Sequence, residues 1–358
     1  MTTLEFIVPG DPQQRTGGYL YDARIVSELR QQQWTVNVTG LEGQFPLVDK
    51  VACQAMSTVL ERQPDQTRVV IDGLALGNLP DAVGPHAKRL DITALVHHPL
   101  ADETGLDKAT RQRLTEHERQ ALHHCRQIIV TSRFTARRLV ELGLTERQAR
   151  VIEPGVVPAR IGARITERLA GRDDGLPEQW LCVGSLTPRK GQNVLLDALA
   201  RLDSRAWHLK LVGSPDRDPV FAESIRQQID NLDLTGQVSL LGETEADGLD
   251  QLYDQATLCV VPSWYEGYGM VVTESLARGL PLITTTGGAL TETVPDNAGL
   301  KVPPGDIDAL SNALKRWLGD SKLRHSMTMQ ALAHRSSLPD WTSAGRQFAR
   351  AVIEPGRE

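Results

Sequence analysis

One stretch, residues 262–288, constrains the fold more strongly than any other part of this 358-residue chain. It follows an apolar run at 258–261 that predicts a buried strand. A turn rich in glycine follows at 263–269, then a helical pattern at 270–278 and a second apolar strand at 282–286. Strand, helix and strand in this order predict a parallel βαβ unit of a doubly wound α/β fold.

Two carboxylates in this stretch suggest a ligand site. Glu266 precedes the helix and Glu274 lies inside it, so both belong to the edge where the strands end and where such sheets bind ligands. Gly267 and Gly269 allow a close approach of the backbone, and the helix start offers free N–H groups to an anion. A nucleoside diphosphate-sugar fits this pattern, with its pyrophosphate on the helix start. The alternative is an ordinary βαβ unit with two solvated glutamates, and the flanking glycines argue against it.

These residues carry a family resemblance. Glu266-Gly-Tyr-Gly, then Glu274, Gly287-Gly288 and Glu292, resembles the signature of the retaining glycosyltransferase family 4. The resemblance implies the GT-B fold, in which two Rossmann-like doubly wound α/β domains face a central cleft. It places an N-terminal acceptor-binding domain at 1–160, a C-terminal nucleotide-sugar-binding domain at 161–338, and a C-terminal helix at 339–358 that packs back on the first domain.

Composition agrees with two ordinary domains. A hydrophobic content of 40% is enough for two cores, and a net charge of −6 argues against a general nucleic-acid binder. The cysteines are scattered without a C-x-x-C pair, which is typical of a reducing compartment. The run Leu4–Pro9 is too short for a signal peptide, so we expect a cytoplasmic protein.

The first strand, Leu4–Pro9, is followed by a polar loop, the pair Gly17-Gly18 and a helical pattern that begins at Tyr19. Strand, glycine pair and helix are typical of a loop that approaches a phosphate, although a turn with positive φ explains the glycines equally well. The family resemblance implies that Gly17 and Gly18 cover the donor phosphates and that Tyr19 lies on the acceptor side.

Polar residues end two later strands of the first half. Asp72 follows the strand that begins at Arg68, and His97 and His98 end the strand that begins at Ile92. Asp72 either contacts a ligand or caps the next turn, and a pair of histidines is more often structural. The resemblance implies a histidine here that contacts the donor sugar. Position favours His97, with His98 as the fallback, and Asp72 and His98 are candidates for the acceptor side.

The second half restarts with a strand at Trp180–Gly184, after a charged region at 161–179 that we expect to be a linker. Lys190, in the loop that follows, is expected at the same edge as Glu266, where it can neutralise a leaving diphosphate. The alternative is a solvated loop lysine. The family usually has an arginine at the position of Ser185, and Arg189 is a candidate to replace it.

Contact with a membrane is a further question, since many family members act on lipid-linked acceptors. Basic and acidic side chains nearly balance over residues 1–155, so we expect no broad attraction to anionic lipid. Ser132 is predicted to cap a helix that carries Arg133, Arg137 and Arg138. These arginines form either a peripheral membrane contact or a solvated helix face.

The sequence therefore predicts a metal-independent retaining glycosyltransferase with a UDP- or GDP-linked donor and a glycan, lipid-linked or small-molecule acceptor. It needs no cofactor, and we expect no metal site. A non-hydrolysing nucleotide-sugar 2-epimerase and a non-catalytic donor-binding subunit remain alternatives. The catalytic candidates are His97, Glu266 and Lys190. The donor-binding candidates are Gly17, Gly18, Ser185, Arg189, Lys190, Glu266, Gly267, Tyr268, Gly269, Met270, Val271 and Glu274.

Overall fold

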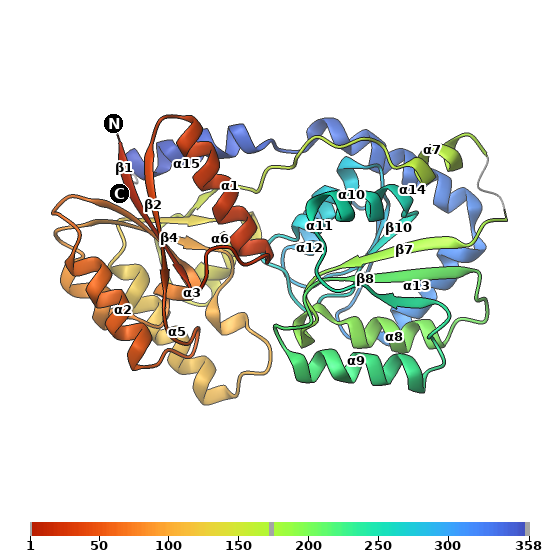
Figure 1. The fold of residues 1–358 in the computed structure, drawn as a ribbon, viewed down its shortest axis with the longest axis horizontal. Helices are drawn as coiled ribbons and strands as arrows, with labels where there is room; N and C mark the ends of the chain where they lie inside the picture. Colours follow the sequence, from red (N-terminus) through yellow and green to blue (C-terminus); the bar gives the residue numbers. More distant parts are fainter. Residues whose placement is uncertain (1, 172–174, 355–358) are drawn as a thin grey trace. The chain divides into compact units, whose positions relative to one another are not determined.

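The computed structural model describes residues 2–171 and 175–354 and divides into two compact units (Figure 1). Unit 1 comprises Met1–Gly155 and Pro339–Glu358, and unit 2 comprises Val156–Leu338. The break lies at Gly155, slightly before the expected boundary at 160. The C-terminal segment belongs to unit 1.

Unit 1 is built on a six-stranded sheet in the order β2-β1-β3-β4-β5-β6, and every pair is parallel. Parallel strands covered by helices on both faces are continuous apolar runs, and β1 is buried at every position after its first residue. The strands are β1 (Thr3–Pro9), β2 (Thr35–Leu41), β3 (Arg68–Asp72), β4 (Asp91–Val96), β5 (Gln127–Val130) and β6 (Arg150–Val151).

Most α-helices of unit 1 begin at a side chain that accepts a hydrogen bond from an amide of the first turn, and α1 and α4 are the exceptions. Ser132 accepts a hydrogen bond from the Thr135 amide at 2.9 Å, which confirms the predicted cap. The C-terminal helix α15 packs on α1, and its Phe348 stacks on Phe6 with ring centroids 6.4 Å apart. The helices are α1 (Gly17–Gln31), α2 (Lys50–Glu61), α3 (Gly73–Leu76), α4 (Pro80–Val83), α5 (Lys108–His123), α6 (Arg133–Glu141) and α15 (Trp341–Ile353).

Unit 2 is also built on a six-stranded parallel sheet, in the order β12-β11-β10-β7-β8-β9. Trp180 and Trp207 stack face to face in its core at 5.2 Å. The strands are β7 (Glu178–Val183), β8 (Trp207–Val212), β9 (Val238–Leu240), β10 (Leu258–Val261), β11 (Leu282–Thr285) and β12 (Gly299–Val302).

The helices of unit 2 include α7 (Ala163–Leu169), so the expectation of a linker over 161–179 was wrong for part of that range. The helix is short and charged and fully buries only one large apolar side chain, Ile165, so the sequence shows no clear period there. The other α-helices are α8 (Gln192–Ala200), α9 (Pro219–Asn231), α10 (Ala246–Gln255), α11 (Met270–Ala277), α12 (Leu290–Thr293), α13 (Ile307–Gly319) and α14 (Ser321–His334).

The two sheets share one topological feature that locates ligand sites. In unit 1 the chain reverses its direction of travel across the sheet between β1 and β3, and in unit 2 between β7 and β10. Ligands of doubly wound sheets bind outside the carboxyl ends of the strands at such switch points. In the part of the chain that the structure describes, no helix has the length and apolarity needed to cross a bilayer.

Candidate functional sites

The loop that follows β10 holds Glu266 at the switch point of unit 2. The Glu266 amide donates to Gly287 O at 3.3 Å, and the Ala289 amide donates to Glu266 O at 2.8 Å. These bonds form a parallel bridge between Glu266 and Gly288, so the loop is tied to the segment that follows β11. The Glu266 side chain is therefore held at a fixed, buried position.

Two cations and one hydroxyl surround the Glu266 carboxylate. Lys190 Nζ lies 2.6 Å from Oε1, Arg189 Nη1 lies 3.5 Å from Oε2, and the Ser263 hydroxyl donates to Oε1 at 2.7 Å. Burial alone would raise the pKa of Glu266, but Lys190 and then Arg189 lower it to about 2. The carboxylate is thus ionised, and the three charged side chains together carry one net positive charge.

The cations keep part of their surface in solvent. The side chains of Lys190 and Arg189 are 20% and 24% exposed, whereas that of Glu266 is 9% exposed. Arg189 Nη1 also donates to Tyr265 O at 2.8 Å. Adjacent residues need not face the same way, but here both cations reach one carboxylate, and an anion can approach their outer sides.

The turn that carries these cations depends on Gly191. Its φ of 68° lies in the left-handed region, and a Cβ there would lie 2.2 Å from Pro262 O. The Trp264 amide donates to Arg189 O at 2.8 Å across the same contact. The loops after β7 and β10 are therefore locked together, which keeps the Lys190–Glu266 pair in register.

Helix α11 begins beside Glu266 with Gly269 as its N-cap. Gly269 has φ 88°, and a Cβ there would lie 2.9 Å from the Leu290 side chain. The first amides of an α-helix have no acceptor within the helix, so Met270 and Val271 present N–H groups and the positive end of the helix dipole. Gly267 and Tyr268 complete the loop, and Tyr268 is buried.

Glu274 lies one turn inside α11 and is partly exposed. One of its oxygens accepts a hydrogen bond from the Tyr253 hydroxyl of α10 at 2.9 Å. Tyr253 is buried, and burial, with the Glu274 charge adding to it, raises the pKa of the Tyr253 hydroxyl well above its usual value. The tyrosine therefore stays protonated and orients the carboxylate.

Ser185, at the position where the family usually has arginine, follows β7 directly. Its carbonyl oxygen accepts a hydrogen bond from Gln192 Nε2 at 3.0 Å. The guanidinium nearest to the Glu266 carboxylate among the described ion pairs is that of Arg189. That Arg189 replaces the missing arginine at a diphosphate remains a prediction.

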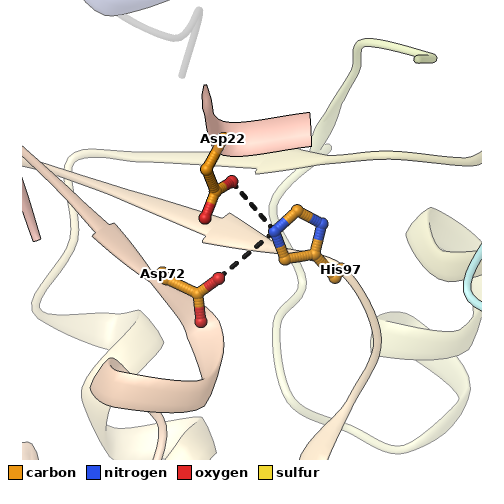
Figure 2. A group of neighbouring side chains, drawn as sticks. All are labelled: Asp22, Asp72 and His97. Carbon is orange, nitrogen blue, oxygen red and sulfur yellow. Dashed lines mark hydrogen bonds and ion pairs between the residues drawn. The ribbon is translucent and has the colours of Figure 1, made fainter. Parts of the chain in front are cut away.

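In unit 1 the corresponding edge holds Asp22, Asp72 and His97 (Figure 2). His97 follows β4, Asp72 ends β3 and Asp22 lies on the buried face of α1. His97 Nε2 lies 3.1 Å from Asp22 Oδ1 and 3.2 Å from Asp72 Oδ2. The structure therefore brings the predicted His97 and Asp72 together and adds a carboxylate that the sequence analysis missed.

Two other residues predicted for this edge, Tyr19 and His98, form contacts within the protein. The Tyr19 hydroxyl donates to Pro9 O at 2.5 Å, and His98 Nε2 lies 2.5 Å from Glu103 Oε1. A Cβ on Gly18 would lie 3.2 Å from the His97 ring, whereas a Cβ on Gly17 would meet no atom within 4 Å. Gly18 therefore packs under the imidazole, and Gly17 borders open space that a ligand can enter.

Asp22, Asp72 and His97 are also the group that could hold a metal ion among the described residues. Each offers one ligand atom, but the imidazole Nε2 is the nitrogen that both carboxylates contact. A cation there would have to displace the Nε2 hydrogen and both ion pairs. Metal independence stays a prediction.

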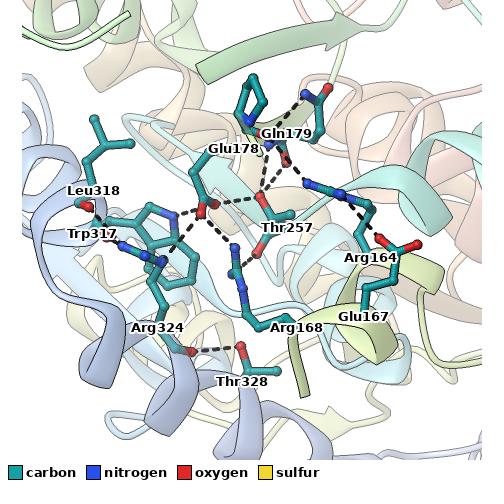
Figure 3. Close-up of polar contacts among 11 residues, drawn as sticks. Arg164, Glu167, Arg168, Glu178, Gln179, Thr257, Trp317, Leu318, Arg324 and Thr328 are labelled. Atoms are coloured by element: carbon teal, nitrogen blue, oxygen red, sulfur yellow. Dashed lines mark hydrogen bonds and ion pairs between the residues drawn. The ribbon is translucent and has the colours of Figure 1, made fainter. Parts of the chain in front are cut away.

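A further buried glutamate, Glu178, lies at the opposite, amino end of the unit 2 sheet (Figure 3). Arg168 Nη2 lies 2.6 Å from its Oε1, and Arg324 Nε lies 3.4 Å from the same oxygen. Thr257 Oγ1 and Trp317 Nε1 donate to Oε2 at 2.7 and 3.0 Å. Every partner is a side chain of the protein itself.

Several of these residues were not predicted from the sequence. Asp22 could have been noticed because it interrupts the apolar face of α1, between Tyr21 and Ile25. Ser263 and Tyr253 gave no signal, because a serine in a turn and a tyrosine on a helix are common without function.

Two family models match the chain. The model described as "Glycosyltransferase Family 4" matches residues 79–160, and that described as "Glycosyl transferases group 1" matches residues 168–334. The D-inositol 3-phosphate glycosyltransferase of Acidothermus cellulolyticus is 34% identical over 58% of this chain and 48% of its own length. That of Nocardia farcinica is 30% identical over 67% of this chain and 58% of its own length. The chain spans about half the length of the curated relatives it matches.

Solved structures with the same fold cover nearly the whole chain. Sucrose-phosphate synthase from Thermosynechococcus elongatus superposes with a TM-score of 0.80 at 22% identity, covering 98% of each chain. HepE from Anabaena, solved in complex with UDP-glucose, gives 0.75 at 18% identity and covers 97% of this chain and 99% of its own. At these identities the likeness establishes the fold.

Proposed function

The chain belongs to glycosyltransferase family 4 and has the GT-B fold, and on this premise we propose that it transfers a sugar from a nucleoside diphosphate-sugar to an acceptor hydroxyl with retention of anomeric configuration. The donor carries UDP or GDP. The acceptor is a glycan, a lipid-linked sugar or a small molecule. Unit 2 binds the donor, and unit 1 binds the acceptor.

The observation that carries the proposal is the Lys190–Glu266–Arg189 cluster beside the start of α11. A diphosphate needs cations and N–H donors, and the outer sides of Lys190 and Arg189 and the first amides of α11 supply both. Glu266 holds the cations in place and is assigned to the donor sugar. Glu274, oriented by Tyr253, is assigned to the ribose hydroxyls.

The proposed reaction replaces one bond at the anomeric carbon. The bond from that carbon to the phosphate oxygen breaks, and the acceptor oxygen attacks from the same face. The acceptor proton passes to the leaving phosphate, and a nucleoside diphosphate departs. Charge grows on the leaving phosphate as the bond breaks, so Lys190 and Arg189 act most strongly in the transition state.

The proposal assigns the charge of the diphosphate to protein groups, so we expect no requirement for a metal ion. His97 is assigned to the donor sugar by family resemblance, and Tyr19, Asp72 and His98 remain candidates for the acceptor side. The basic helix α6 is a candidate for peripheral contact with a membrane, although Arg138 already pairs with Asp102 at 2.8 Å.

A panel of UDP- and GDP-sugars tests the proposal. Each donor is first screened for binding by thermal shift and then incubated with and without acceptors. Transfer to an acceptor, with product anomers identified by NMR, supports the proposal. Conversion of the donor to its 2-epimer without acceptor identifies an epimerase, and tight binding without turnover identifies a donor-binding subunit.

A further inference from the structure

We propose that Asp22 is a positioning residue for His97: together with Asp72 it holds the imidazole by Nε2, so that Nδ1–H is the edge offered to substrate. This inference rests on the proposed function, in which His97 contacts the donor sugar. Figure 2 shows both carboxylates turned toward the same ring nitrogen, with the other nitrogen on the far side of the ring.

The contacts at Nε2 settle which atom carries a hydrogen. Two carboxylate oxygens, at 3.1 and 3.2 Å, face this nitrogen, and oxygens of ionised carboxylates only accept. Nε2 must therefore donate to them. Among the described residues no hydrogen bond involves Nδ1, and the His97 side chain is 17% exposed whereas those of Asp22 and Asp72 are 5% and 8% exposed.

Asp72 and Asp22 differ in their contacts with groups other than His97. Asp72 Oδ1 accepts the Leu74 amide at 2.7 Å and caps α3, so this residue has a structural role of its own. Asp22 contacts His97 through Oδ1, and its Oδ2 is buried without a hydrogen-bond partner in the structure. A buried carboxylate on the apolar face of α1 destabilises the fold unless it is paired. Asp22 is paired with His97, so we attribute the presence of this buried carboxylate to its effect on the imidazole.

The ring is fixed from its other sides as well. Tyr21 meets it edge-on at 5.5 Å, and Gly18 lies close beneath it. The hydroxyls of Thr131 and Thr135 reach the His97 carbonyl oxygen at 3.4 Å. The imidazole therefore cannot turn to present Nε2 outward without breaking two ion pairs and these packing contacts.

The charges around the ring keep it protonated. Burial lowers the pKa of His97, but Asp22 and then Asp72 outweigh it and raise this pKa to about 10. Burial raises the pKa of Asp22 to about 7 against the opposing effect of His97, and the neighbouring Asp72 carboxylate adds to the increase. The cluster thus takes up one proton near pH 10, on the imidazole, and a second near pH 7. The titratable groups that face His97 are Asp22 on α1 and Asp72 at the end of β3. The Tyr21 ring also contacts the imidazole, but its hydroxyl, whose pKa burial raises, donates to Ile152 O at 3.0 Å.

The direct test is an NMR titration of the ¹⁵N-labelled histidine ring in the wild-type protein, in Asp22→Asn, in Asp22→Glu and in a control. The control is Asp81→Asn, an exposed carboxylate of α4 in the same unit. In the wild type and in Asp81→Asn we expect both His97 nitrogens to remain protonated up to about pH 9. In Asp22→Asn the ring should lose a proton at lower pH, and Asp22→Glu should restore most of the wild-type behaviour.

This readout does not depend on catalysis, so it separates the inference from the proposed function. A wild-type His97 that loses its proton below pH 8 overturns the inference, and this result needs no variant to fold. Unchanged titration in a folded Asp22→Asn protein overturns it too. So does stoichiometric binding of Zn²⁺ that Asp22→Asn abolishes, because the cluster would then be a metal site.

Kinetics then test whether the positioned proton matters to the reaction. A group that must stay protonated is active below its pKa, and its contribution is lost as the pH rises through that pKa. The alkaline loss of activity should therefore move to lower pH in Asp22→Asn, with kcat at pH 9 reduced about 10-fold or more and KM for the donor nearly unchanged. A pH profile of kcat identical to that of the wild type contradicts the inference. Absence of turnover with every donor contradicts the proposed function alone.

Discussion

Unit 2 contains two buried glutamates that look alike in isolation and lie at opposite edges of one sheet. The Glu266 and Glu178 side chains are 9% and 10% exposed, and each pairs with two cations. Glu266 follows β10 at the carboxyl edge, whereas Glu178 opens β7 at the amino edge. The same charge pattern therefore occurs once at the carboxyl edge, where doubly wound sheets bind ligands, and once at the opposite edge.

The two clusters differ in the further contacts of their cations and in what lies beside them. At Glu178, Arg168 is 6% exposed and stacks over Trp317 at 5.4 Å (Figure 3). Arg324 is 21% exposed and also donates to the carbonyl oxygens of Trp317 and Leu318 at 2.8 Å. At Glu266, Lys190 and Arg189 keep about a fifth to a quarter of their surface in solvent. Exposure alone does not separate the two clusters, because Arg324 is as exposed as Lys190. The Glu266 cluster differs because it lies at the carboxyl edge beside the start of α11, where free N–H groups can face an anion.

This comparison separates a structural ion pair from a binding site. A buried carboxylate whose partners come from several elements joins those elements, here α7, β7, α13 and α14. A buried carboxylate that aligns cations at the carboxyl edge, beside a helix start, prepares a site for an anion.

The largest expected effect is on stability. Glu178→Gln removes the counter-charge of Arg168 and Arg324 and should lower the free energy of unfolding by about 3–5 kcal/mol. Urea denaturation followed by tryptophan fluorescence measures it. The control is Glu223→Gln, which removes an exposed i,i+3 pair with Arg226 and should cost less than about 1 kcal/mol. Equal stability of the two variants would contradict the structural role of Glu178.

The next effect is on turnover. Lys190→Ala should reduce kcat by roughly 100-fold or more, because it removes a preorganised cation from the leaving diphosphate. Arg189→Ala should show a comparable loss if it replaces the missing arginine, and almost none if it is merely solvated. Steady-state kinetics with the best donor measure both. Arg201→Ala, which removes an exposed pair with Asp308, is the control and should leave kcat unchanged.

A smaller effect is expected for nucleotide affinity. Glu274→Ala should weaken binding of UDP or GDP by about 1.5–3 kcal/mol, the range for a hydrogen bond to a charged group. Tyr253→Phe should weaken it less, because it removes one hydrogen bond to the carboxylate and leaves the carboxylate in place. Glu266→Ala should act chiefly on kcat. Calorimetric affinities unchanged in Glu274→Ala would refute the ribose assignment.

The pH dependence provides a fourth test. The pKa of Glu266 is lowered to about 2, so its carboxylate is ionised throughout pH 4–8 and should contribute no acid limb to activity there. Burial raises the pKa of Glu266 and Lys190 lowers it, so this pKa should rise when Lys190 is removed. A ¹³C titration of the Glu266 carboxyl in the wild type and in Lys190→Met measures the change. An unchanged titration would show that Lys190 does not control this carboxylate.

The smallest effect is expected from metal removal. Dialysis against EDTA should change activity by less than about 2-fold, since protein cations are assigned to the diphosphate. Loss of activity that Mg²⁺ or Mn²⁺ restores would refute metal independence.

The sequence predicted what local patterns encode. Apolar runs and glycines identified the strand, turn and helix around Glu266, and the parallel topology placed Lys190 at the same edge. It could not reveal the Asp22–His97 contact, because these residues are 75 positions apart and meet only through packing of α1 on the sheet. Glu178 was missed for the same reason, since its partners converge from α7, α13 and α14.

Element boundaries were predicted where apolar periodicity was strong and missed elsewhere. Strand β2 is partly exposed and polar along most of its length, and α7 fully buries one large apolar side chain, so neither shows a clear pattern. The pairing of Arg189 with Glu266 also depends on a tight turn at Pro188–Lys190, which ends at the left-handed Gly191 and packs against Pro262. The contact with Pro262 is not visible in the local sequence.

Hydrogen exchange followed by mass spectrometry, with and without the best-binding nucleoside diphosphate, tests the central claim most directly. The claim is that the carboxyl-edge cluster binds the diphosphate and the amino-edge cluster does not. We expect the ligand to slow exchange at residues 185–191 and 269–273 and to leave residues 164–169 and 317–324 unchanged. Slowed exchange at the Glu178 cluster, or bound nucleotide without any change at 185–191 and 269–273, would contradict the account.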